Sequence, residues 1–74
     1  MPYINIYAYS GRTEEVKKKT AQAIVKAASE AIGAPQTAFT VFFNDVDKEN
    51  WDAQIEPIFE PLKDKMLIED GELV

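Results

Sequence analysis

The sequence contains no cysteine and no histidine, and only 3 of its 74 residues are glycine. Without cysteine the chain cannot form a disulfide, and without both residues it lacks the usual ligands of structural zinc. A chain of this length buries only roughly 60% of the surface that it exposes when unfolded, so its fold is marginal without support. Disulfides, metals and association are the common supports of small domains. We therefore expect a single domain over residues 1–74 that associates with copies of itself and binds no metal or other cofactor.

Positive charge and long apolar runs are also scarce. The chain has 8 basic and 13 acidic residues, which gives a net charge of −5. An acidic surface repels the phosphates of nucleic acids and the anionic headgroups of lipids. No apolar run approaches the roughly 20 residues that cross a bilayer, and the N-terminus lacks the pattern of a secretory signal. These absences predict a cytoplasmic protein with neither nucleic acid nor membrane as a partner.

The stretch from residue 2 to residue 9 alternates in side-chain character and predicts a strand. Pro2 suits the first position because proline cannot donate to a sheet ladder. One side carries isoleucine and alanine, and the other carries Asn5 and three tyrosines. Both sides are at least half apolar, so we expect one to pack on a helix and the other to meet a partner subunit. If Met1 is removed, the ring nitrogen of Pro2 becomes a secondary amine that can take up or release a proton.

The following segment predicts a helix that ends at residue 32. Thr13 is a suitable N-cap, and two glutamates follow where the helix dipole favours negative charge. Small and apolar residues recur on one face, and we interpret the lysines at 17–19 as a solvated face. Gly33 fits the position after the last helical residue, and Pro35 blocks continuation.

A second strand is predicted over residues 37–46, which are rich in β-branched and aromatic residues. A strand, a helix and a strand joined by short loops form a right-handed crossover with parallel pairing. Apolar residues at three- and four-residue steps then indicate a helix within 52–66, which Pro61 is expected to weaken or kink. The dipeptide at 70–71, Asp-Gly, predicts a hairpin. The expected fold class is therefore α+β: a β-α-β protomer with a C-terminal helix and a short terminal hairpin, assembling through its sheet.

Four carboxylates gather around the loop after the second predicted strand: Asp45, Asp47, Glu49 and Asp52. Their spacing lacks the glycine and the terminal glutamate of a calcium-binding loop. We therefore interpret them as solvated loop charge.

The strongest functional signal is the proline that opens the first strand together with the motif that opens the helix. Pro2 precedes the strand, Gly11-Arg12-Thr13 precedes the helix, Ala34-Pro35 precedes the second strand, and an aromatic residue, Trp51, follows. In these features the chain resembles the 4-oxalocrotonate tautomerase superfamily, the short β-α-β tautomerases with an N-terminal proline. The resemblance runs from Pro2 to about Trp51. It implies a homo-oligomeric isomerase that interconverts the keto and enol forms of small 2-oxo acids.

The resemblance also implies a role for three residues. Pro2 would be the catalytic general base and acid, and its nitrogen must be neutral at the working pH. An apolar pocket and a nearby cation both lower the pKa of such an amine. Arg12 would supply that cation and bind the substrate carboxylate as a fork. Trp51 would also contribute to substrate binding by forming a wall of the pocket and excluding water.

Two departures from the family pattern bear on the substrate. Thr40 stands where the best-studied members carry a second arginine, and a longer helix replaces the glycine-rich hairpin after Trp51. The chain is most similar to the dimeric branch that acts on phenylpyruvate-like monocarboxylates, so a dimer is favoured and a hexamer is the alternative. Thr40 also leaves a second functional hypothesis, a catalytically inactive interaction protein or small-ligand carrier with the same fold.

Overall fold

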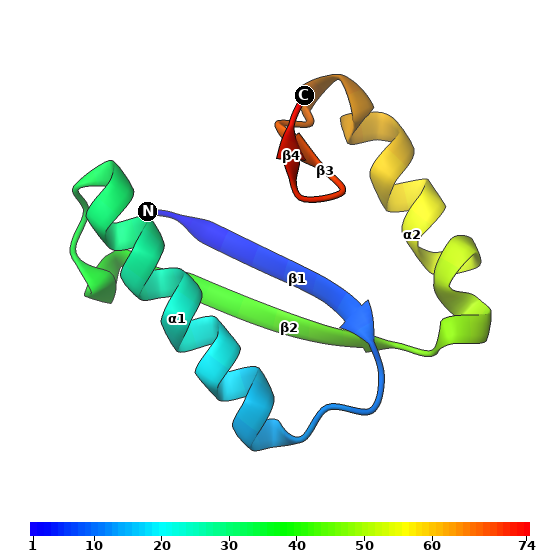
Figure 1. The fold of residues 1–74 in the computed structure, drawn as a ribbon, viewed down its shortest axis with the longest axis horizontal. Coiled ribbons are helices and arrows are strands. Elements are labelled where there is room, and N and C mark those ends of the chain that lie inside the picture. The colour runs from blue at the N-terminus through cyan, green and yellow to red at the C-terminus, as the bar shows by residue number, and fades with distance from the viewer.

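The computed structural model describes residues 1–74 and consists of a β-α-β unit followed by a C-terminal arm (Figure 1). The unit contains β1 (Tyr3–Tyr9), α1 (Glu14–Ile32), the 3-10 helix η1 (Gln36–Ala38) and β2 (Thr40–Val46). After the 3-10 helix η2 (Lys48–Asn50), the arm contains α2 (Trp51–Phe59), the 3-10 helix η3 (Glu60–Lys65), β3 (Ile68–Glu69) and β4 (Glu72–Leu73). We use "C-terminal arm" for residues 51–74. The predicted α+β class and order of elements are confirmed.

The sheet of the β-α-β unit has two parallel strands. Backbone hydrogen bonds continue the pairing at both ends, from the Thr40 amide to the Pro2 carbonyl at 3.1 Å and from the Ser10 amide to the Val46 carbonyl at 3.0 Å. Because the sheet has no third strand, the outer edge of β1 and the outer edge of β2 are both unpaired.

The ends of α1 are defined as the sequence predicts. The Thr13 hydroxyl accepts a hydrogen bond from the Val16 amide at 3.2 Å, which is an N-cap. At the other end Gly33 has a φ of 76° and donates its amide to the Ser29 carbonyl at 3.0 Å. The hairpin turn is also confirmed, since Asp70 (φ 51°) and Gly71 (φ 84°) both take the left-handed conformation of a tight hairpin turn.

Two element bounds differ from the prediction for reasons of local hydrogen bonding. The second strand begins at Thr40 rather than at residue 37, because residues 36–38 form a 3-10 turn in which the Ala38 amide bonds to the Pro35 carbonyl at 3.0 Å. The regular part of the second helix spans Trp51–Phe59, and a 3-10 helix replaces it from residue 60. Pro61 explains this change, because proline lacks the amide that an α-helical hydrogen bond requires.

Very little of the protomer is buried. Val46 is the one residue with an exposed fraction as low as 2%. The radius of gyration is 13.6 Å, compared with about 11 Å for a compact chain of this length. On the sheet face turned away from α1, the rings of Tyr3 and Phe42 contact each other at a centroid distance of 5.6 Å and yet remain exposed. The β-α-β unit therefore does not close a core by itself.

Candidate active site

Pro2 lies at the start of β1 and is held there through its backbone. Its carbonyl accepts the Thr40 amide, so the first residue of β2 lies directly beside it. The nitrogen of Pro2 is part of the peptide bond to Met1 and has no basic lone pair in this form. Met1 is 98% exposed, so its removal would free the nitrogen without taking a packed side chain from the fold.

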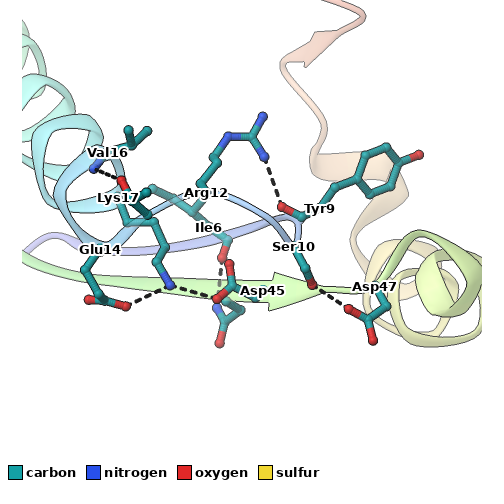
Figure 2. Close-up of polar contacts among 11 residues, drawn as sticks. Ile6, Tyr9, Ser10, Arg12, Glu14, Val16, Lys17, Asp45 and Asp47 are labelled. Atoms are coloured by element: carbon teal, nitrogen blue, oxygen red, sulfur yellow. Dashed lines mark hydrogen bonds and ion pairs between the residues drawn. The ribbon is translucent and has the colours of Figure 1, made fainter.

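Arg12 lies beyond the other end of β1, in the turn before α1. Gly11 makes this turn with a φ of 119°, a conformation that favours glycine. The Nη1 atom of Arg12 donates to the Tyr9 carbonyl at 3.0 Å (Figure 2). No carboxylate of the protomer pairs with this guanidinium. Its remaining donors are therefore available to an external carboxylate.

Trp51 begins α2 and contacts the same strand end as Arg12. Its ring meets the ring of Tyr9 edge-on, with centroids 4.9 Å apart and planes at 76°. Tyr9 therefore positions both predicted binding residues, Arg12 through its carbonyl and Trp51 through its ring. Sequence reasoning missed Tyr9, whose place at the end of a strand next to the glycine turn was the available signal.

Pro2 and Arg12 are not brought together within one protomer. They flank opposite ends of β1, and a strand of 7 residues spans roughly 20 Å. A site that contains both side chains therefore requires two copies of the chain.

A hollow of about 610 Å³ adjoins the Trp51 end of the sheet. Its lining consists of Tyr7 from β1 and eight residues of the C-terminal arm, and Lys65 is the only charged residue among them. Such a volume is within the usual range of small-molecule pockets.

Comparison with known proteins assigns the family. The model of the family described as "Tautomerase enzyme" matches residues 2–58, a span that includes Pro2, Arg12 and Trp51. This chain belongs to the tautomerase family. The tautomerase assignment agrees with the resemblance carried by the motifs at the start of the strand and of the helix, and it makes the protein an enzyme of the isomerase class.

Curated relatives of this tautomerase match over the same part of the chain. The 2-hydroxymuconate tautomerase of Comamonas testosteroni is 45% identical over 51 residues, which are 69% of this chain and 81% of the relative. The enzyme of the same name from Pseudomonas putida is 43% identical with the same coverage. A probable tautomerase of Bacillus cereus is 39% identical over 69% of this chain and 84% of its own length. No solved structure matches the chain, and none of its helices is long and apolar enough to cross a membrane.

An ion-paired cluster fixes α1 to β2 close to the Arg12 turn of the tautomerase. Lys17 Nζ lies 2.7 Å from an Asp45 oxygen and 2.9 Å from a Glu14 oxygen, and its side chain is only 14% exposed (Figure 2). The hydrogen bonds to Asp45 and then Glu14 raise the pKa of Lys17, and the hydrogen bond to Lys17 lowers the pKa of Glu14. The prediction that the lysines at 17–19 form a solvated face is therefore wrong for Lys17, because its side chain reaches the neighbouring strand β2.

The exits of the two strands are joined by a second polar contact. The Ser10 hydroxyl donates to the Asp47 carboxylate at 2.7 Å (Figure 2). Asp45 and Asp47 are both exposed, in agreement with their interpretation as solvated charge, and each also bonds to a protein partner. The contact could have been predicted, because Ser10 and Asp47 each follow a strand and the carboxyl ends of parallel strands meet at one edge.

Proposed function

We propose that this tautomerase interconverts the enol and keto forms of a small 2-oxo monocarboxylate with an aromatic or apolar tail, such as phenylpyruvate, and that the amine of Pro2 moves the proton. The observation that carries the proposal is the unpaired guanidinium of Arg12 beside the aromatic wall of Trp51 at one strand end. Relatives are named for 2-hydroxymuconate, whose enol carries two carboxylates. Thr40, whose amide bonds to the Pro2 carbonyl, carries a neutral side chain, which favours a substrate with one carboxylate.

In the proposed mechanism, removal of Met1 gives Pro2 a neutral secondary amine. This nitrogen accepts the proton of the enol hydroxyl as the carbonyl forms, and it delivers a proton to the adjacent carbon, so the amine is regenerated. Arg12 binds the carboxylate through two parallel N–H bonds and orients the carbon toward the amine. Its positive charge also disfavours protonation of the nitrogen. Trp51 keeps water away from the reacting atoms.

The active assembly is a homo-oligomer, for which a dimer is the smallest arrangement. The outer edge of β1 is unpaired, and two such edges can pair antiparallel. In that arrangement the Pro2 end of one strand lies beside the Arg12 end of the other. Each dimer then holds two equivalent sites, each with Pro2 from one copy and with Arg12 and Trp51 from its partner.

The test combines intact mass with turnover of phenylenolpyruvate. Protein whose mass is lower by one methionine should convert the enol to the ketone, which is followed by loss of enol absorbance. A Pro2→Ala variant and a form that keeps Met1 should lose this activity, because neither has the secondary amine. Equal rates for the three proteins would refute the role of Pro2. Binding of phenylpyruvate without turnover by the processed protein would instead favour a small-ligand carrier on the same fold.

A further inference from the structure

The loop that carries Arg12 is anchored at the edge of the sheet where both strands end. Ser10 follows β1; its amide donates to the Val46 carbonyl at 3.0 Å, and its hydroxyl donates to the Asp47 carboxylate at 2.7 Å (Figure 2). Arg12 lies two residues further on, and its guanidinium donates to the carbonyl of Tyr9, the residue before Ser10. The hydrogen bond from Ser10 to Asp47, which we call the Ser10–Asp47 clamp, therefore restrains the backbone that presents the guanidinium.

Asp47 also belongs to the turn that leads to Trp51. It is the residue before η2, and its carbonyl accepts the Asn50 amide at 2.9 Å. Trp51 follows at the start of α2. Asp47 thus contacts both segments that carry the predicted binding side chains, through its carboxylate toward the Arg12 loop and through its carbonyl toward Trp51.

Packing does not hold the Arg12 loop in place. Residues 9–16 are all exposed, so no buried side chain fixes the loop. Gly11, with a φ of 119°, gives the backbone beside Arg12 more conformational freedom than any other residue would. Hydrogen bonds must therefore set the position of the loop, and a hydroxyl bonded to a charged carboxylate makes one of the stronger kinds.

We propose that Asp47 is a positioning residue of this tautomerase, which holds the loop through Ser10 so that the Arg12 guanidinium meets the substrate carboxylate as a fork. The inference rests on the proposed function and extends it to a residue outside the predicted site. Asp47 acts through Arg12 and not on the reacting atoms. Loss of the clamp therefore weakens recognition of the carboxylate and leaves the proton transfer at Pro2 intact.

The first experiment compares three variants of the turn before α2. Asp47→Ala removes the acceptor of the clamp, whereas Asp47→Asn keeps an amide oxygen that accepts the Ser10 hydroxyl. Glu49→Ala is the matched control, because Glu49 lies in the same turn, is exposed and forms no ion pair. Asp47→Ala should lower kcat/KM for phenylenolpyruvate about 10-fold, through KM, because a misplaced binding group costs orientation. Asp47→Asn and Glu49→Ala should retain most of the wild-type value.

A second substrate separates positioning from a general structural effect. The enol of methyl phenylpyruvate carries an ester, which cannot accept two charge-assisted bonds from Arg12. Its kcat/KM should therefore be the same for wild type and Asp47→Ala. A variant that only lost folded protein would lose activity on both substrates equally, and urea midpoints measure that loss. Equal losses on the acid and the ester, or an Asp47→Asn variant as impaired as Asp47→Ala, would overturn the proposal.

Ser10→Ala removes the donor of the same hydrogen bond and serves if Asp47→Ala does not fold. It should reproduce the loss on the acid, and the double variant should be no worse than either single variant, because all three remove one interaction. A double variant with the product of the two single losses would refute the clamp.

Binding without turnover distinguishes this proposal from the proposed function. Trp51 is the only tryptophan, so its fluorescence reports binding of phenylpyruvate. Ser10→Ala should raise the Kd of phenylpyruvate about 10-fold. If wild type binds phenylpyruvate in this way but does not turn over the enol, the proposed function fails and the clamp stands. If wild type turns over the enol and Ser10→Ala changes neither Kd nor kcat/KM, the clamp fails and the proposed function stands.

Discussion

Subunit mixing tests whether Pro2 and Arg12 of one copy serve different sites. The two residues flank a strand of 7 residues, roughly 20 Å long, and an arginine side chain cannot cross that distance. Pro2→Ala removes the proposed base, and Arg12→Ala removes the proposed carboxylate fork, whose loss should cost about 2–4 kcal/mol or a factor of about 30–1,000 in kcat/KM. Each variant alone should therefore be nearly inactive.

Mixing the two variants, with exchange of subunits, should restore activity. In a mixed dimer one site combines the intact Pro2 of the Arg12→Ala chain with the intact Arg12 of the Pro2→Ala chain. Half of the dimers are mixed at equal amounts, and each has one good site of two, so the expected activity is about one quarter of wild type. The assay is the initial rate of phenylenolpyruvate loss after equilibration at low protein concentration.

A chain with both substitutions provides the matched control. Mixed in equal amounts with wild type, it yields mixed dimers in which both sites lack one residue, and only about one quarter of all sites remain active. If Pro2 and Arg12 of the same chain formed a site, about one half would remain and the mixture of single variants would show no recovery. Either result would refute the assignment of the site to two copies.

Three further predictions concern single residues. Thr40→Arg adds a cation at the residue that pairs with the Pro2 carbonyl, and it should raise the preference for 2-hydroxymuconate over phenylenolpyruvate by up to about 5-fold in relative kcat/KM, since a solvent-exposed ion pair contributes up to about 1 kcal/mol. The pKa of Lys17 is raised from an ordinary value of 10.5, so its contribution to stability is complete below pH 10.5 and is lost as the pH rises through the folded pKa. The pKa of Glu14 is lowered from an ordinary value of 4.5, so its contribution to stability is present above pH 4.5 and is lost as the pH falls through the folded pKa. Urea midpoints of wild type should exceed those of Lys17→Met between about pH 5 and pH 10, and the two should converge outside that range; a constant difference at all pH values would contradict the ion-pair account. Thr13→Ala removes the N-cap of α1 and should lower the free energy of unfolding by about 1 kcal/mol, whereas Thr37→Ala, which removes no side-chain hydrogen bond, should have little effect in the same urea titration.

The features that the sequence predicted well are those encoded by neighbouring residues. The cap at Thr13, the left-handed glycine at Gly33 and the turn at 70–71 each depend on one or two side chains and the backbone beside them. The start of β2 was misplaced because β-branched composition extends back to Thr37, while the hydrogen bonds after Pro35 favour a turn.

The contacts of the candidate site depend on residues that are far apart in the chain. Tyr9 and Trp51 meet only because β1 and β2 are parallel and end at the same edge. The reach of Lys17 to Asp45 requires the position of α1 against the sheet, which periodicity alone does not specify. Family motifs identified Pro2 and Arg12, but only the length of the strand between them shows that one protomer cannot unite them.

Tyr9 links two properties that are usually considered separately. Its carbonyl holds the guanidinium of Arg12, and its ring supports the residue from which the whole C-terminal arm departs. A substitution that changes the orientation of the Tyr9 ring would therefore move both the Arg12 guanidinium and the C-terminal arm. In the proposed site, selection for a new substrate at this corner is consequently also selection on the orientation of the C-terminal arm.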